Sequence, residues 1–374
     1  MFIYIIFFLF SLGQIARISL SNGQVNFYLY ELFILVFFIT LFLKNKFKPI
    51  INYKSKFKFT ILFLFWLLIT HLISSFEYSI ERNIISFLYL LRTSFYIFFI
   101  VYSYKLFSNK LKTQISKGIL LFIFLTAIFS IIQYFLYPNL RNLLYLGWDP
   151  HQYRMFGTFL DTSISATLYG MILLYLFFNL EQIRLEQSIK KLLIILYSAF
   201  GLLTYSRAFY ISIFIVFSYF FISKKKFIYV FLFLIIFTFG VFFLPKLQGE
   251  STNLKRVYSI SARFDDYKEG LTMLKKSPIW GYGYNRLMFV REINKSENKY
   301  PNHSLSSFQS SSLTILVSSG IIGLILFILS LTELWSLNRI SKYFILFLFI
   351  FSLMDNVFLH PFALFLLLFF ISDS

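Results

Sequence analysis

Stretches of apolar residues long enough to cross a lipid bilayer recur along the whole chain. A soluble domain would be about half apolar and about a quarter charged, whereas this sequence is 58% hydrophobic and only 14% charged. Its 54 Phe and 26 Tyr residues are too many for one water-soluble core. We therefore expect lipid to be the solvent, which excludes a cytosolic enzyme, a secreted module and a disordered chain.

Polar residues divide these stretches into about twelve expected spans of roughly 16–22 residues, each able to cross the bilayer with some tilt. The expected spans are residues 2–19, 27–43, 59–76, 84–103, 118–137, 158–179, 192–205, 208–222, 227–244, 311–331, 343–358 and 361–373. Between 192 and 222, Ser206 and Arg207 favour a tight turn over one long helix. The sequence therefore predicts an all-α polytopic membrane protein, with residues 1–374 as a single integral membrane domain.

The basic residues indicate which side of the membrane each loop faces. If the helices alternate in direction, 18 Lys and Arg residues fall on one side, in loops 44–58, 104–117, 180–191, 223–226 and 332–342. The short loops opposite hold only Arg82, Arg141, Arg154 and Arg207. This bias places the basic loops and both termini in the cytoplasm. The net charge of +19 is then mostly an orientation signal, so the expected partners include membrane lipid and no nucleic acid.

One external loop, residues 245–310, is far longer than the others. Loops of this length are uncommon unless they have a function. Between Ala262 and Lys276, four large apolar residues recur at helical spacing with charges between them. They are Phe264, Tyr267, Leu271 and Leu274. This pattern predicts a helix that lies on the membrane surface or over a cavity.

Motifs of soluble chemistry are missing. Residues 281–283 (Gly-Tyr-Gly) lack the third glycine of a dinucleotide site and follow a turn with a proline, not a strand. The chain has no Cys, and His71, His151, His303 and His360 have no metal-ligand spacing. We therefore expect neither a metal site nor a bound cofactor.

Arginine stands out on the external side, at Arg154, Arg207 and Arg263. A guanidinium offers forked donors that match phosphate oxygens, and it stays charged at working pH. Several of them facing one cavity would suit a pyrophosphate or another polyanion. The alternative is that each arginine reaches the lipid headgroups or pairs with a nearby carboxylate.

Four segments, in this order along the chain, resemble a known family. They are Arg154–Phe159 with Ser165-Ala166, then Leu203–Ala208, then Arg263–Tyr267 through Ser277–Gly283, and finally Gly320–Gly323. The chain is similar to the O-antigen polymerase and ligase superfamily of bacterial inner-membrane proteins, which holds the Wzy-type polymerases and the WaaL-type ligases. The resemblance covers residues 154–323 and implies a GT-C-like architecture with a large periplasmic loop.

The sequence departs from the ligase pattern at one informative position. The ligase pattern is a His-(Asn/Ser/Gln) pair, followed by nine residues and then by Gly-x-x-Gly. Counting back from Gly320, the pair is Gln309-Ser310, and His303 is too far away. Imidazole accepts a proton near neutral pH, whereas a glutamine side chain does not. This difference favours a polymerase over a ligase.

The resemblance implies glycosyl transfer at the periplasmic face of the inner membrane, from a growing glycan on undecaprenyl pyrophosphate to a single lipid-linked repeat unit. The leaving group is then a lipid pyrophosphate, and arginines can stabilise its developing charge without a metal. The partners implied are the undecaprenyl-pyrophosphate-linked oligosaccharide, a chain-length regulator and a flippase. The alternatives are an O-antigen ligase, a capsule-type glycan polymerase and a transporter of the lipid-linked glycan. A transporter would show two related halves, and the sequence has none.

Within this interpretation we predict Arg207, Arg263 and His303 as catalytic residues. The predicted substrate-binding residues are Arg154, Arg286, Arg291, Asp161, Asp265 and Trp280. The base for the acceptor hydroxyl is open among His303, Asp161, Asp265 and Asp266, and Trp148 and Trp280 are candidates to stack on sugars. The alternative for His303 is that it is an exposed loop residue without a catalytic role. The alternative for Asp265 and Asp266 is that they lie on a solvated helix face. Arg291 lies outside the family-like segments, and we expect it to tolerate alanine.

Some residues inside the apolar spans have structural interpretations. Glu31, Arg92 and Asp355 are unfavourable there unless they are paired, so we expect an ion pair among them. Gly320 and Gly323 are spaced as small residues are where membrane helices pack closely. We expect packing to be their role.

The charge bias makes the topology testable with a reporter that is active only outside the cytoplasm. Fusion at about residue 290 should give activity, and fusions at about residues 50, 110 and 225 should give none. Activity at residue 50 or 225 would overturn the orientation.

Overall fold

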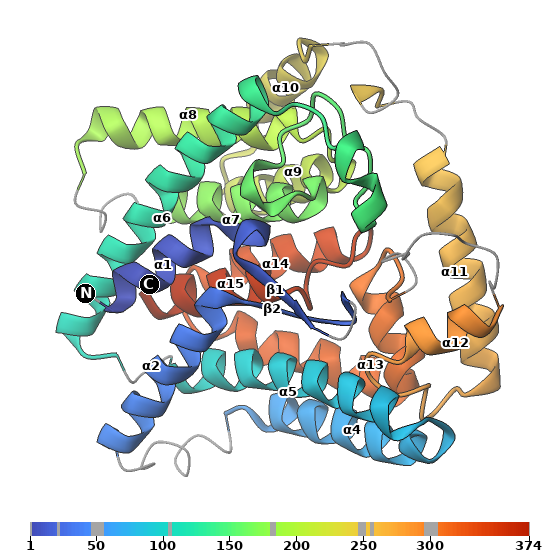
Figure 1. Ribbon diagram of the computed structural model, residues 1–374. Helices are drawn as coiled ribbons and strands as arrows, with labels where there is room; N and C mark the ends of the chain where they lie inside the picture. Colours follow the sequence, from blue (N-terminus) through green and yellow to red (C-terminus); the bar gives the residue numbers. More distant parts are fainter. Residues whose placement is uncertain are drawn as a thin grey trace.

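The computed structural model of the chain describes residues 2–20, 23–45, 56–103, 107–179, 185–245, 252–254, 258–294 and 306–373. Most of this part is helical (Figure 1). Its apolar helices are α1 (Phe2–Ser11), α2 (Leu29–Asn45), α4 (Lys58–Ser74), α5 (Ile80–Ser103), α6 (Asn109–Leu136), α7 (Thr162–Phe178), α8 (Gln187–Leu203), α9 (Arg207–Ser223), α10 (Phe227–Phe242), α13 (Ser311–Trp335), α14 (Ser341–Ser352) and α15 (Pro361–Asp373). Helices α11 (Tyr258–Lys276) and α12 (Leu287–Asn294) lie in the segment predicted to be the long external loop.

Four helices of the described part are long and apolar enough to cross a membrane, namely α4, α5, α6 and α13. Six shorter apolar helices accompany them: α1, α7, α9, α10, α14 and α15. This set is consistent with the expected helical membrane protein, while the count of about twelve spans stays a prediction. The chain ends lie toward one end of the bundle, and α11 and α12 lie at the other (Figure 1).

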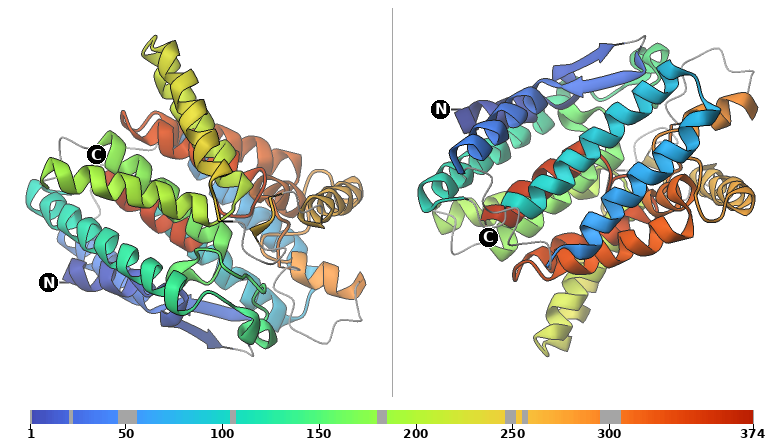
Figure 2. Two further views of the ribbon diagram at one scale, coloured as in Figure 1. Left: turned by 90° about the horizontal axis from the view of Figure 1, so that it is seen from above. Right: turned by 90° about the horizontal axis from the view of Figure 1, so that it is seen from below.

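The core is built around α7 and α15, whose residues are almost all buried. Helix α15 lies against α5, α6 and α7. The many phenylalanines fill this core by stacking: the Phe10 and Phe365 ring centroids are 3.9 Å apart, and those of Phe38 and Phe99 are 3.7 Å apart. By contrast, α10 projects from the bundle (Figure 2) and buries none of its residues. Its apolar surface is therefore available to lipid.

The expected first span, residues 2–19, is wrong in its second half. Helix α1 ends at Ser11, and the chain continues through a short 3-10 helix, η1 (Gly13–Ala16), into an antiparallel hairpin of β1 (Arg17–Leu20) and β2 (Val25–Tyr28). The two strands hydrogen-bond to each other, so their backbone N–H and C=O groups have partners without forming a helix. The described residues are otherwise mainly helical, as the prediction of an all-α membrane protein requires, and the two-stranded sheet is an addition that the sequence did not predict.

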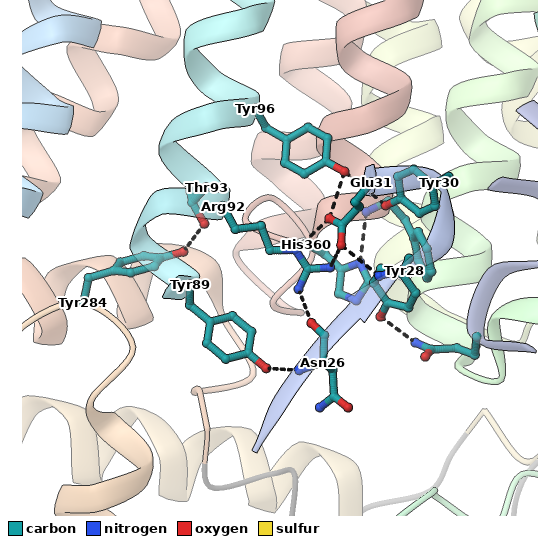
Figure 3. Close-up of polar contacts among 12 residues, drawn as sticks. Asn26, Tyr28, Tyr30, Glu31, Tyr89, Arg92, Thr93, Tyr96, Tyr284 and His360 are labelled. Atoms are coloured by element: carbon teal, nitrogen blue, oxygen red, sulfur yellow. Dashed lines mark hydrogen bonds and ion pairs between the residues drawn. The ribbon is translucent and has the colours of Figure 1, made fainter. Parts of the chain in front are cut away.

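A partly buried ion pair attaches this hairpin to the helices (Figure 3). Arg92 of α5 donates from Nε to Glu31 Oε1 at 2.7 Å and from Nη2 to Glu31 Oε2 at 2.9 Å. Its Nη1 donates to the carbonyl of Asn26 in β2 at 3.1 Å. Tyr96 also donates to Glu31, at 3.0 Å. The expected ion pair is confirmed for Glu31 and Arg92, because the forked geometry satisfies both charges where water is excluded.

The turn expected at Ser206 and Arg207 is confirmed. Helix α8 ends at Leu203, Tyr205 adopts a left-handed backbone with φ of 52°, and Ser206 Oγ accepts from the Phe209 amide at 3.3 Å to cap α9. The helix predicted in the long loop is present as α11, which extends over Tyr258–Lys276. The span predicted for 343–358 is too long, because α14 ends at Ser352. Asp355 therefore lies in a loop between α14 and α15, outside both helices.

Helix α13 is broken at Gly320, which has φ of 70° and ψ of −175°. The Ser318 carbonyl accepts from the Gly283 amide at 2.8 Å, and the Ile321 amide donates to the Pro278 carbonyl at 2.9 Å. A Cβ at Gly320 would lie 2.0 Å from the carbonyl oxygen of Ile279. This close approach of two backbones requires glycine, but Gly320 meets a loop at a break in α13, and the close packing between helices that we expected is not what the structure shows here. The contact also joins two of the family-like segments, 277–283 and 320–323.

Candidate functional site

The segment Arg154–Phe159 is buried and contains no α-helix; its last three residues form a short 3-10 helix, η5 (Gly157–Phe159). Gln133 Oε1 of α6 accepts from the amides of Phe156 and Gly157, each at 2.9 Å. The Met155 amide donates to the Leu203 carbonyl at 3.0 Å, and Arg154 Nε donates to the Thr204 carbonyl at 2.6 Å. Irregular backbone is tolerated in a membrane protein only where the protein itself supplies hydrogen bonds. These bonds fix Arg154 beside the turn that opens α9 at Arg207.

Arg263 of α11 reaches across to the loop between α14 and α15. Its Nη2 donates to Asp355 Oδ1 at 3.2 Å, and the two side chains are 23% and 15% exposed. Arg263 Nε is buried and has no hydrogen-bond partner among the described residues. The charge of Arg207 interacts with those of Arg263 and Asp355. Arg263 therefore contacts the Asp355 carboxylate, and Arg207 lies near enough to both for their charges to interact.

A second carboxylate, Asp161, joins this group. Its Oδ1 accepts from the amides of Ser163 at 2.7 Å and Ile164 at 2.9 Å, so it caps α7. Burial raises the pKa of Asp161 above its usual range, while hydrogen bonds and the charge of Arg154 oppose the rise. Burial likewise raises the pKa of Asp355, with Arg263 opposing and Asp161 adding to the rise.

We call these residues the arginine–aspartate cluster: Arg154, Arg207, Arg263, Asp161 and Asp355. They come from five places that are distant in sequence: the buried segment before α7, the α7 cap, the α8–α9 turn, α11 and the α14–α15 loop. The charge of Asp149 also interacts with those of Arg154 and Asp161, so three guanidinium groups share three carboxylates. Arg263 keeps a buried Nε without a hydrogen-bond partner among the described residues, and such a donor on a fixed cation suits an oxyanion such as a diphosphate.

Arg286, predicted to bind substrate, is instead 0% exposed. Its Nη2 donates to Asn83 Oδ1 at 2.7 Å, its Nη1 bonds Ser74 Oγ, and its guanidinium lies 5.0 Å from the centre of the Tyr78 ring. These partners belong to the ends of α4 and α5. The geometry favours a structural role for Arg286, holding the 283–286 segment against those helices.

Arg291, also predicted to bind substrate, is 3% exposed and surrounded by acceptors of the chain. It donates to both carboxylate oxygens of Glu269 and to Asp266 Oδ1, each at 3.0 Å, and to the Ser307 carbonyl at 3.1 Å. The ring of Phe308 lies 4.7 Å from its guanidinium carbon. Arg291 thus clamps α11, α12 and the 306–310 segment together, which argues against the expected tolerance to alanine.

The other predicted site residues lie outside the cluster. Trp280 is 43% exposed and stacks on Trp66, with ring centroids 5.1 Å apart. Asp265 is exposed on α11, and Asp266 is occupied by Arg291 and by the Gln309 amide at 2.8 Å. Trp280 therefore keeps an open ring for a sugar, whereas Asp265 has the geometry of a solvated helix face. His303 lies outside the described residues.

Asp355 is the cluster residue that sequence reasoning did not assign to the site. The apolar run on either side of it made it part of an expected span, and its contact with Arg263 joins residues 92 positions apart. The only local signal was the sequence Asp355-Asn356 shortly before Pro361, which is unusual inside a membrane helix.

The sequence profile of a family described as O-antigen ligase matches residues 192–328. This match supports the O-antigen polymerase and ligase superfamily. Members of the family are glycosyltransferase-like enzymes that act on O-antigen. Arg207 and Arg263 lie inside the matched region, and Arg154, Asp161 and Asp355 lie outside it. No curated protein matches the chain.

The Arg291 clamp makes a prediction about stability. Arg291→Ala leaves Glu269 and Asp266 without their shared partner, and breaking a buried ion pair in this way typically lowers stability by about 3–5 kcal/mol. We expect a lower thermal unfolding temperature of the purified protein in detergent. The unfolding temperature of Arg291→Lys should lie between those of the wild type and Arg291→Ala, because lysine keeps the charge but lacks the forked donors. Lys275→Ala, an exposed change on α11, the helix that carries Glu269 and Asp266, is the matched control. An unchanged unfolding temperature for Arg291→Ala would contradict the clamp.

Proposed function

We propose that the protein is an O-antigen polymerase of the bacterial inner membrane, with both termini in the cytoplasm and the arginine–aspartate cluster at the periplasmic face. It transfers a growing glycan from undecaprenyl pyrophosphate to a new lipid-linked repeat unit. A flippase and a chain-length regulator of the same pathway are its proposed partners. The observation that carries this proposal is the cluster itself, since the charges of Arg207 and Arg263 interact and both residues lie within the region that matches the family.

The chemistry follows from where charge develops. The bond between C1 of the donor sugar and the pyrophosphate oxygen breaks, and the electron pair stays on the leaving pyrophosphate. Arg207 and Arg263 stabilise that charge more in the transition state than in the ground state, which accelerates the reaction. Arg154, held on the Thr204 carbonyl, adds to the positive field. In this proposal the arginines supply the charge stabilisation, so the transfer is metal-independent and a chelator has no effect.

A specific observation favours polymerase over ligase. Gln309 stands where the ligase pattern has its histidine, and its backbone N–H donates to Asp266 Oδ2 at 2.8 Å. A glutamine side chain does not accept the proton of an acceptor hydroxyl near neutral pH. O-antigen ligase is the second candidate, because the matching family is described by that activity.

The two candidates and a transporter predict different lipopolysaccharides in a deletion strain. Loss of a polymerase leaves lipopolysaccharide capped with a single repeat unit, which gel electrophoresis resolves. Loss of a ligase leaves a bare core while polymer accumulates on the lipid carrier. Loss of a transporter keeps the repeat unit on the cytoplasmic face. A bare core would contradict the polymerase.

Replacing Arg207 or Arg263 with alanine in the complemented strain should abolish chain extension. Each loss should raise the barrier by roughly 2–4 kcal/mol, about 30- to 1000-fold in rate. Arg→Lys variants should be impaired less, because lysine keeps the charge without the forked geometry.

Arg141 is the matched control, since it is exposed in another external loop and its Nε contacts only Asn139 Oδ1, at 3.3 Å, among the bonds described. Arg141→Ala should extend chains normally, and immunoblots of the membrane fraction should show equal amounts of each variant. Near-normal polymer from both Arg207→Ala and Arg263→Ala would make those arginines interfacial anchors.

A further inference from the structure

We propose that Asp355 is a catalytic residue of this site: its carboxylate accepts the proton of the acceptor hydroxyl. The inference rests on the proposed glycosyl transfer and names the base that the family-like segments leave open. It follows from where the fold holds Asp355, what surrounds it and which oxygens are already engaged.

The loop that carries Asp355 is clasped from two sides. Tyr267 of α11 donates to the Leu353 carbonyl at 2.8 Å. At the start of α13, Ser311 Oγ donates to Asn356 Oδ1 at 2.9 Å and accepts from the Phe358 amide at 3.1 Å. These bonds bracket Asp355 on both sides in sequence. A carboxylate held this firmly between α11 and α13 is preorganised, as a catalytic group must be.

The groups that face Asp355 come from three elements. Arg263 of α11 donates to its Oδ1, and the charges of Arg207 at the start of α9 and of Asp161, the N-cap of α7, interact with it. Ser163 in the first turn of α7 also lies near this carboxylate and lowers its pKa. Burial and the Asp161 charge raise the pKa of Asp355, and Arg263 opposes them; the net change is upward. A pKa closer to neutral makes a carboxylate a better proton acceptor at working pH.

Asp161 has the same neighbours but a different task. Its Oδ1 accepts the two amides that begin α7, so its orientation is fixed by the helix. Asp355 caps no helix. Its ion pair with Arg263 is single, at 3.2 Å, and Arg263 keeps a buried Nε without a partner among the described residues. A diphosphate oxygen that bonds this Nε would compete with Asp355 for the guanidinium and loosen the carboxylate.

The step balances as follows. The acceptor hydroxyl oxygen forms a bond to C1 of the donor sugar, and its proton passes to the Asp355 carboxylate. The C1–oxygen bond to the pyrophosphate breaks, and that electron pair remains on the pyrophosphate beside Arg207 and Arg263. Asp355 returns its proton to water after the product leaves. The carboxylate, the two arginines and the two substrates account for every charge.

The test uses the full-length protein in detergent with lipid-linked repeat units extracted from the deletion strain. Asp355→Asn keeps the size of the side chain and removes the base. We expect its turnover at saturating donor to fall about 10²- to 10⁴-fold, while its KM for donor does not rise, because Arg263 loses a competitor. Asp355→Glu should recover part of the turnover. Glu81→Gln, a change at an exposed carboxylate at the start of α5, is the matched control and should leave turnover unchanged.

The pH profile separates a base from a residue that only orients Arg263. A base works when deprotonated, so wild-type turnover should be full above the raised pKa of Asp355 and fall as the pH drops through it. The residual turnover of Asp355→Asn should not show this fall at low pH, whereas the turnover of Asp355→Glu should still show one. The proposal would be overturned if Asp355→Asn had a raised KM for donor with unchanged turnover, or if its turnover showed the same fall at low pH as the wild type. Absence of transfer by the wild-type protein would instead overturn the proposed function.

Discussion

The constraint on which this structure depends is that backbone groups within a membrane protein must find their hydrogen-bond partners inside the chain. Helices do so by themselves, and the non-helical segments at the α11–α12 end of the bundle do so through each other. The segment after Arg154 bonds Gln133 and the α8–α9 turn, and the break in α13 at Gly320 bonds residues 278–283. These requirements draw together loops that are far apart in sequence. The arginine–aspartate cluster forms where they converge.

Most charged groups within the fold likewise find partners inside the chain. Arg92 is matched by Glu31, and Arg291 is matched by Asp266 and Glu269. Arg286 bonds neutral groups at the ends of α4 and α5, and its Nε, like that of Arg263, is buried without a hydrogen-bond partner among the described residues. Such pairing removes most of the penalty of placing a charge away from water. In the cluster, three arginines share Asp161, Asp355 and the nearby Asp149, and the Arg263 donor fork is incompletely used. An unused donor on a fixed cation is what an oxygen of an incoming diphosphate can bind.

The sequence predicted a useful part of this arrangement. Local hydropathy identified the apolar helices, the Ser206–Arg207 turn and the helix of the long loop, because each depends on residues that are neighbours in the chain. It failed for residues 12–19, where a 3-10 turn and the first strand of a hairpin replace helix, and for the end of α14. It named Arg154, Arg207, Arg263 and Asp161 but assigned Asp355 to a span. It also grouped Arg286 and Arg291 with the site, since their burial and partners depend on contacts that no local pattern records.

The sequence alone therefore determined the solvent, the family resemblance and the arginine chemistry, because composition, spacing and side-chain type are local properties. Only the tertiary structure decided which charges neutralise one another. Arg263 and Asp355 are separated by 92 positions and meet at 3.2 Å, and Arg291 finds Glu269 on a different helix. Pairing depends on distances in space, since the Coulomb energy of two charges falls with their separation and rises where water is excluded. Arginines that look alike in the sequence therefore have different surroundings in the fold: some hold helices together, and others form the candidate catalytic cluster.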